Sequence, residues 1–237
     1  LLVYANRWPE MAELVLVSGG SGGIGAATCR HLATKGVTPI VGYASGQDRA
    51  KSIAEETGGT ALALDLSDND VIDHAVEWLA SSEHPLTTCI LAASPPPVIG
   101  PFGKIDDEDM MRQWKVNVFG PRRLVAGLVK SCFRKRKQGT VIAVLTEAMG
   151  ISNGMASPGM GAYVIAKYGL MGVLATANAE YPWLTATTIS PGFTETEMLT
   201  AFDERFLEIT RNQQPDGRFT SPEEVARNIV SLVSTIS

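Results

Sequence analysis

The chain has 237 residues, 45% hydrophobic and 19% charged, a balance typical of a globular protein rather than a disordered one. Its 25 acidic and 20 basic side chains leave a net charge of −5, which argues against nucleic acid as a partner. No apolar run is long enough for a membrane span, and three scattered cysteines predict neither a disulfide framework nor a metal site, so we expect the reducing cytoplasm.

Short apolar runs alternate with helix-like stretches along the chain. A buried strand at 14–17 precedes a glycine cluster and a helix from Ile24 to Lys35, closed by Gly36. Further strands are predicted at 39–43, 60–64, 88–92, 140–145 and 185–189, and further helices at about 47–57, 68–81, 107–131, 161–180 and 221–234. Six strands interleaved with helices predict one doubly wound α/β domain over 11–237, with a mainly parallel sheet flanked by helices. Residues 1–10 are expected to be an N-terminal extension, and one more strand could follow residue 237.

The first loop reads Ser18-Gly19-Gly20-Ser21-Gly22-Gly23-Ile24-Gly25. Glycines between a strand and a helix allow the backbone to approach a diphosphate closely, and the helix start directs free N–H groups toward it. A tight strand-to-helix turn without a ligand could use glycine as well. Because the loop follows the first strand and opens a helix, dinucleotide binding is the favoured interpretation.

A second motif, Tyr163-Val-Ile-Ala-Lys167, lies in a predicted helix. Residues four apart share one helix face, so the phenol and the ammonium can reach the same site. A nearby cation is expected to lower the pKa of the tyrosine toward the working range of an acid–base catalyst. Taken alone, the same pattern could be a surface pair.

With the spacing Gly-x-x-x-Gly-x-Gly and the later Tyr-x-x-x-Lys, the chain from about Leu14 onward resembles the short-chain dehydrogenase/reductase family, most of all the 3-oxoacyl-carrier-protein reductase type. The resemblance implies a Rossmann-type fold and a hydride transfer between NADP(H) and a carbonyl or alcohol substrate, such as a 3-oxoacyl thioester. It also implies that Tyr163 protonates the substrate oxygen, that Lys167 holds the nicotinamide ribose, and that Asn117 supports a proton-relay water.

By the same resemblance, the cofactor-binding residues follow the ends of successive strands. They are Gly19, Ser21, Gly22, Gly23, Ile24, Tyr43, Ser45, Arg49, Asp65, Leu66, Ala92, Ala93, Tyr163, Lys167, Pro191, Gly192, Thr194 and Thr196. An aspartate after the second strand would select NAD, whereas Tyr43, Ser45 and Arg49 stand there and favour NADP(H) over NAD(H). Asp48, and the absence of a basic residue at Gly22, weaken that preference.

The family's active-site serine, usually thirteen residues before the tyrosine, is missing, and Gly150 stands there. Judged by its place after the strand, Glu147 takes the serine's position; protonated it could donate a hydrogen bond, but ionised it would repel a developing oxyanion. Thr146 and Ser152 are alternative donors, and Glu147 could instead face solvent. The choice stays open at this point.

The expected partners are a small-molecule substrate and further copies of the chain. Helices 107–131 and 161–180 resemble those with which relatives form homodimers and homotetramers. The basic run 134–137, with Arg122 and Arg123, is either a solvated face or a docking site for an acidic carrier protein. The main rival function is a catalytically impaired nucleotide-binding regulator or scaffold. An epimerase or dehydratase of the extended branch is disfavoured by the glycine spacing and the chain length.

Overall fold

Six parallel strands form one sheet in this protein, described by a computed structural model over residues 13–151 and 154–234. They are β1 (Leu14–Ser18), β2 (Thr38–Tyr43), β3 (Thr60–Ala63), β4 (Leu86–Leu91), β5 (Gly139–Val144) and β6 (Leu184–Ile189). Their order is β3-β2-β1-β4-β5-β6, so the direction of winding reverses between β1 and β4. The predicted parallel, doubly wound sheet is confirmed. The predicted extension over 1–10 lies outside the described residues.

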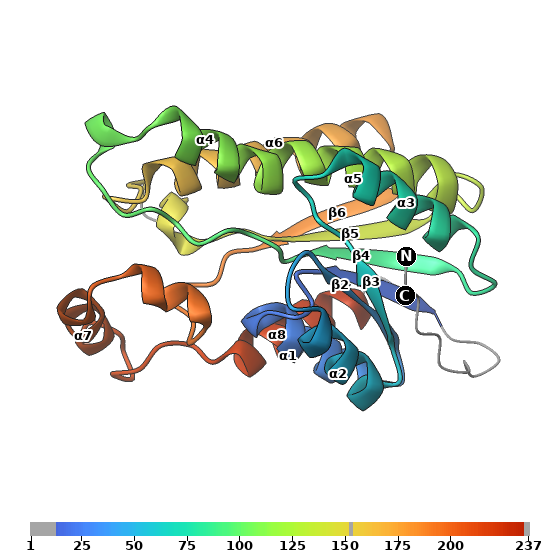
Figure 1. Ribbon diagram of the computed structural model, residues 1–237, viewed down its shortest axis with the longest axis horizontal. Coiled ribbons are helices and arrows are strands. Elements are labelled where there is room, and N and C mark those ends of the chain that lie inside the picture. The colour runs from blue at the N-terminus through green and yellow to red at the C-terminus, as the bar shows by residue number, and fades with distance from the viewer. Residues whose placement is uncertain (1–12, 152–153, 235–237) are drawn as a thin grey trace.

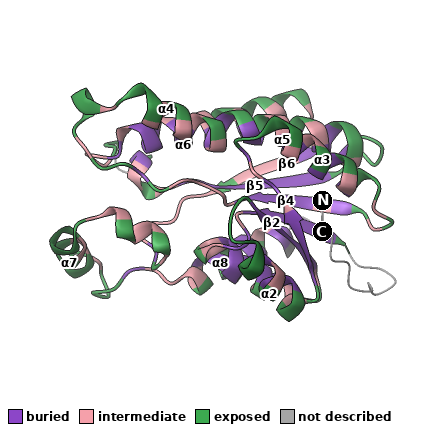
Figure 2. Ribbon diagram, in the orientation of Figure 1, coloured by how far each residue is buried: buried purple, intermediate pink, exposed green. Residues whose placement is uncertain are grey.

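Helices cover both faces of the sheet (Figure 1). One layer contains α1 (Gly23–Thr34), α2 (Gln47–Thr57) and α8 (Pro222–Ser234), and the other contains α3 (Asn69–Ala80), α4 (Asp107–Trp114), α5 (Gly120–Leu128) and α6 (Gly161–Glu180). Leu14 and Leu16 pack with the second layer, whereas Val15 and Val17 pack with the first. This alternation buries both faces of β1 to β5, as the purple strands of Figure 2 show, and explains their apolar runs, whereas β6 at the edge is mostly half-buried.

The predicted helix over 107–131 is interrupted, which corrects the sequence interpretation. α4 is followed by a π-helical turn at Lys115–Phe119, then by α5 and a second π-helical turn at Val129–Phe133. Pro121 has no N–H for the carbonyl of Asn117, so a regular α-helical ladder cannot continue across this point. The wider turn contains Asn117.

The segment between β6 and α8 contains two elements that the sequence analysis missed. They are a 3₁₀ turn at Glu197–Ala201 and α7 (Glu204–Asn212), in which Asp203 caps the helix by accepting from the N–H groups of its first turn. Four phenylalanines pack against one another within this segment, with ring centroids 5.4–6.0 Å apart: Phe193, Phe202, Phe206 and Phe219. α7 is short, mostly polar and has no buried residue, although its few apolar residues lie on one helix face.

The predicted start of the helix at about 221–234 and the predicted end of the first helix at Gly36 are confirmed. The Ser221 side chain accepts from the N–H of Glu224 at 3.2 Å, while the Glu224 carboxylate accepts from the N–H of Ser221 at 2.8 Å. Gly36 follows α1 with φ of 75°. Over the described ranges, none of the helices combines the length and the apolar character that crossing a bilayer requires.

Candidate active site

The glycine-rich turn lies at the carboxyl end of β1, where the sheet reverses its winding. Gly19 has φ of 67°, and a Cβ on it would lie 2.8 Å from the Cα of Ala93. The Ser18 hydroxyl accepts from the N–H groups of Ala92 and Ala93 at 3.2 and 3.3 Å. The turn therefore needs glycine at position 19, because backbone touches backbone between the ends of β1 and β4.

The N-terminus of α1 is left open toward this turn. Its N-cap residue, Gly22, has no side chain to cap the helix, and the first turn contains no acidic residue. A Cβ on Gly25 would lie 2.7 Å from the carbonyl carbon of Gly19, so the turn and the helix pack closely. Free N–H groups at the positive end of a helix dipole form a site for an anion such as a diphosphate.

The residues after β2 gather beside the same turn. The Ser21 hydroxyl donates to the carbonyl of Ser45 at 3.4 Å. A Cβ on Gly46 would lie 3.4 Å from two nitrogens of the Arg49 guanidinium and 3.8 Å from the Ser21 hydroxyl, so these polar groups converge. Tyr43 is instead buried in the core formed with α1, α2 and α8. Ser21, Ser45 and Arg49 together can receive a further anionic group.

The loop that follows β3 is held by hydrogen bonds between its own residues. Asp65 accepts from the N–H and the hydroxyl of Ser67 at 2.8 and 2.7 Å through one carboxylate oxygen. Leu66 is buried, and a Cβ on Gly120 would lie 2.8 Å from the Leu66 carbonyl carbon. The segment is thus held against the start of α5.

Tyr163 and Lys167 are both buried on one face of α6, 7% and 2% exposed. The Lys167 Nζ lies 5.5 Å from the centroid of the Tyr163 ring and donates to the carbonyl of Val144, the last residue of β5, at 2.8 Å. The Thr146 side chain forms a hydrogen bond with Tyr163 and accepts from the N–H of Ala148 at 3.2 Å. The predicted pair therefore meets a third polar group at the carboxyl end of β5.

Burial controls the protonation of this pair. It raises the pKa of Tyr163 to about 12, although the hydrogen bond with Thr146 acts in the opposite direction. It lowers the pKa of Lys167 to about 7. The expectation that Lys167 would lower the pKa of Tyr163 is not met. Removing the phenolate from water destabilises it more than the neighbouring groups stabilise it. A phenol with a raised pKa stays protonated at neutral pH and is ready to donate.

The position of the missing serine cannot hold a side chain in this fold. Gly150 has φ of 69°, and a Cβ there would lie 2.7 Å from the backbone nitrogen of Ala156. Ser152, one of the alternatives, lies outside the described residues.

Of Glu147 and Thr146, it is Thr146 that the structure brings to Tyr163. The backbone of Thr146 is extended, with φ of −160° and ψ of 144°, so successive side chains point to opposite sides. Glu147 is exposed, and a Cβ on Gly192 would lie 2.6 Å from its carboxylate oxygen. Its N–H donates to the carbonyl of Pro191 at 3.0 Å. The structure therefore favours Thr146 over Glu147 as the polar group beside Tyr163, with Ser152 outside the described residues.

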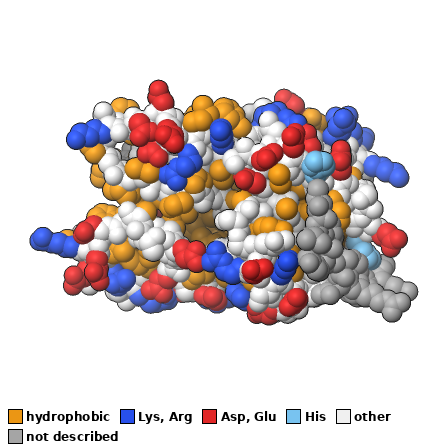
Figure 3. Space-filling model, in the orientation of Figure 1, with side chains coloured by type: hydrophobic (Ala, Val, Ile, Leu, Met, Phe, Trp, Pro, Cys, Tyr) orange, Lys and Arg blue, Asp and Glu red, His pale blue; other side chains and the backbone are white. Residues whose placement is uncertain are grey.

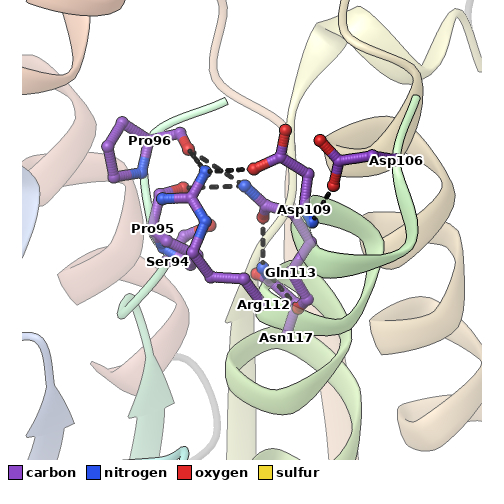
Figure 4. A network of polar contacts seen from close by, with 8 residues as sticks. All are labelled: Ser94, Pro95, Pro96, Asp106, Asp109, Arg112, Gln113 and Asn117. Carbon is purple, nitrogen blue, oxygen red and sulfur yellow. Dashed lines mark hydrogen bonds and ion pairs between the residues drawn. The ribbon is translucent and has the colours of Figure 1, made fainter. Parts of the chain in front are cut away.

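Asn117 belongs to a buried amide network that the sequence analysis missed (Figure 4). Its Nδ2 donates to the backbone carbonyl and to the side-chain Oε1 of Gln113 at 3.2 and 3.0 Å. The Gln113 amide donates in turn to the carbonyls of Pro95 and Pro96 at 3.4 and 3.0 Å. The Asn117 Oδ1 is buried and has no partner among the described residues. Such an acceptor needs a water or a ligand group. The spacing of two amides four apart on a helix could have indicated the pair.

The loop after β6 folds back over the glycine-rich turn. The Thr194 hydroxyl donates to the carbonyl of Gly192 at 3.0 Å. A Cβ on Gly23 would lie 2.8 Å from the Cβ of Thr196, so Thr196 sits directly on the start of α1. The loop and the turn, far apart in sequence, thus border one crevice. Figure 3 shows this face hollowed between the two layers, with hydrophobic side chains around the hollow.

The basic run at 134–137 lies at the other edge of the sheet. It precedes Gly139, the amino end of β5, whereas Thr146 follows the carboxyl end of that strand. Arg136 donates to the carbonyl of Leu86, and Arg123 is paired with Asp73. These cations are therefore not beside Tyr163.

Comparisons with known proteins agree with this geometry. A model of the short chain dehydrogenase family matches residues 13–205. Acetoacetyl-CoA reductase of Paracoccus denitrificans is 31% identical, over 94% of this chain and 91% of that protein. The cyclic-di-GMP-binding biofilm dispersal mediator protein of Escherichia coli (strain K12) is 29% identical, over 93% of this chain and 89% of that protein. The crystal structure of BdcA in complex with NADPH superposes with a TM-score of 0.77 at 27% identity, covering 94% of this chain and 87% of that one.

Proposed function

The chain belongs to the short-chain dehydrogenase family, and we propose that it is an NADP(H)-dependent oxidoreductase acting on a carbonyl or alcohol substrate. One observation carries the proposal: Tyr163, Lys167 and Thr146 meet at the carboxyl end of β5, on the same sheet edge as the open N-terminus of α1. A proton donor and an anion site at one edge are what a dinucleotide-dependent reduction of a carbonyl requires.

The residues around the crevice fit a nicotinamide dinucleotide. The uncapped N-terminus of α1 and the unpartnered Asn117 Oδ1 each offer a polar ligand a hydrogen-bonding group. We assign the diphosphate to Gly19, Ser21, Gly22, Gly23 and Ile24, the adenosine to Asp65, Leu66, Ala92 and Ala93, and the nicotinamide half to Lys167, Pro191, Gly192, Thr194 and Thr196. When bound, the nicotinamide ring supplies or accepts the hydride.

The preference for NADP(H) rests on the groups beside the turn. No carboxylate ends β2, and Ser21, Ser45 and Arg49 converge there instead. A 2′-phosphate would find hydroxyl donors and a cation, whereas the 2′-hydroxyl of NAD(H) would lack the carboxylate that usually holds it. The likeness to BdcA, which was crystallised with NADPH, supports this choice.

In the reduction direction, Tyr163 is the proton donor to the substrate oxygen. Its phenol is protonated at neutral pH because burial raises its pKa to about 12, and the alkoxide that develops on the substrate is a stronger base than phenolate. Thr146 accepts from Ala148, which leaves its own hydroxyl hydrogen for the phenol or for the substrate oxygen. Lys167 donates one hydrogen to Val144, and its other hydrogens can bind the ribose hydroxyls. A water bound to the Asn117 Oδ1 can return a proton to Tyr163.

Replacing Thr146 by valine is expected to lower kcat by about 10²-fold, the usual effect of removing one donor to a developing oxyanion. Valine keeps the shape but removes the hydroxyl that contacts Tyr163. The Kd for NADPH should hardly change, and Thr146→Ser should keep most of the activity. A valine variant with full kcat would remove Thr146 from the mechanism.

The substrate class is tested by NADPH oxidation across a panel of ketones and thioesters. Because acetoacetyl-CoA reductase is among the relatives, we propose a 3-oxoacyl thioester as substrate and include acetoacetyl-CoA and carrier-protein thioesters in the panel. At least one carbonyl compound should be reduced. Binding of NADPH without turnover on the whole panel would favour the regulator alternative, a possibility supported by the relative named for cyclic-di-GMP binding.

We further propose a homodimer or homotetramer formed through α4 to α6. Met111, Phe119 and Tyr168 lie along this layer and are 47%, 49% and 42% exposed, and an interface between copies would cover them. Light scattering should give at least twice the monomer mass, and a monomer would contradict the assignment. Three free thiols fit a reducing compartment, and we place the protein in the cytoplasm.

A further inference from the structure

An ion pair joins two distant segments beside the glycine-rich turn. Arg49, in the first turn of α2, is paired with Glu197, the first residue of the 3₁₀ turn that follows Thr196. The two residues are 148 positions apart in the sequence. Because Thr196 sits on Gly23, the pair lies next to the glycine-rich turn.

The arginine faces polar groups that suit a second anion. Two of its guanidinium nitrogens and the Ser21 hydroxyl converge on Gly46, and Ser21 itself donates to the Ser45 carbonyl. Ser45 and Arg49 follow β2, and Ser21 reaches them from the glycine-rich turn after β1, close to where a bound dinucleotide has its adenosine ribose. In the structure, however, the anion beside Arg49 is a carboxylate of the protein.

We propose that Glu197 is a specificity-determining residue that competes with the 2′-phosphate of NADP(H) for Arg49. The inference rests on the proposed function, because it assumes that the crevice binds a nicotinamide dinucleotide. Glu197 acts through Arg49 and touches no reacting atom. It lowers the affinity for NADP(H) and leaves the affinity for NAD(H) unchanged, so it sets the ratio between the two.

The chemistry of the two cofactors explains why only one of them is affected. A phosphomonoester carries a charge of about −1.5 to −2 at neutral pH and must either displace the Glu197 carboxylate or lie beside it. The 2′-hydroxyl of NAD(H) is neutral and needs no cation. The two side chains are 53% and 76% exposed, so their pairing is weak enough to be exchanged for a phosphate.

The test is the Kd for NADPH and for NADH, measured by fluorescence titration of the full chain without substrate. Glu197→Gln should tighten NADPH binding by about two- to fivefold at low salt, the range an exposed ion pair can contribute, and should leave the Kd for NADH unchanged. Glu197→Asp should behave like the unmodified protein. The gain should shrink at high salt, because screening weakens pairs of exposed charges.

Two further variants separate the contribution of the pair from other effects. Glu195 is an exposed acid of the same loop and makes no ion pair among the described residues. Glu195→Gln should therefore leave the Kd for NADPH and the Kd for NADH unchanged. In an Arg49→Gln background, Glu197→Gln should no longer tighten NADPH binding.

Other outcomes would overturn the inference. Equal tightening of both cofactors, weaker NADPH binding, or the same gain without Arg49 would each show that Glu197 does not compete for that cation. If the unmodified protein binds neither cofactor, the proposed function itself fails. If it binds both and Arg49→Gln changes neither Kd, only the assignment of Arg49, and with it the inference, is lost.

Discussion

Replacing Tyr163 by phenylalanine should lower kcat by about 10²- to 10⁴-fold, the range that a positioned general acid contributes. The ring would still fill its buried site on α6, while the hydroxyl that contacts Thr146 would be gone. The Kd for NADPH should stay nearly constant, because the phenol is proposed to act on the substrate oxygen. Stopped-flow or steady-state NADPH oxidation with the best substrate of the panel measures the effect.

Tyr168→Phe is the matched control for this variant. Tyr168 lies five residues further along α6, and its hydroxyl donates to the backbone carbonyl of Met149 at 2.8 Å. Removing that hydroxyl should change kcat by less than about threefold, since one partly buried hydrogen bond away from the proposed proton donor contributes little. Equal activity of Tyr163→Phe and the unmodified protein would show that the proton comes from another group.

Lys167 should make the stability of the protein depend on pH. Burial lowers its pKa to about 7 in the folded state, against about 10.4 in an unfolded chain. Between these values the unfolded state binds more protons, so the free energy of unfolding rises with pH. Relative to Lys167→Met, the free energy of unfolding of the unmodified protein should rise by about 2 kcal/mol between pH ~7.5 and ~9.5.

Taking the difference between the two proteins is essential, because other buried groups act in the opposite direction. Burial raises the pKa of Cys29 to about 12 and that of Cys132 to about 11, so stability from these thiols is lost as pH rises above their unfolded values. Both proteins retain these thiols, and their effect cancels. Lys130→Met, at an exposed position, controls for methionine itself. A difference that is flat with pH, in urea denaturation, would show that Lys167 is charged in the fold.

Local patterns predicted most of the fold and the central pair. Each strand was found within two residues of its bounds. For β1 to β5 the signal was apolar residues buried against two helix layers, whereas β6 is mostly half-buried. Tyr163 and Lys167 were found because two residues four positions apart on a helix lie on the same face. The glycine turn was found because a side chain at Gly19 or Gly25 would clash with neighbouring backbone, so both positions need glycine.

Contacts between distant segments could not be predicted in this way. Gln113 reaches Pro96 across a loop, and Arg49 meets Glu197 over most of the chain. Thr146 and Glu147 are adjacent in extended backbone after β5, so their side chains point to opposite sides and only Thr146 contacts Tyr163. Counting residues back from Tyr163 does not show which of the two faces it. α7 was missed because it is short, mostly polar and without a buried residue, although its few apolar residues share one helix face.

Deuterium transfer from ring-labelled NADPH tests most directly whether this crevice moves a hydride to a carbonyl carbon. We predict that the alcohol formed by the unmodified protein carries one deuterium at the former carbonyl carbon, as mass spectrometry would show, and that Tyr163→Phe forms almost none of this product. NADPH that is bound but not consumed with any carbonyl compound, or consumed to give an unlabelled alcohol, would contradict the proposed reaction.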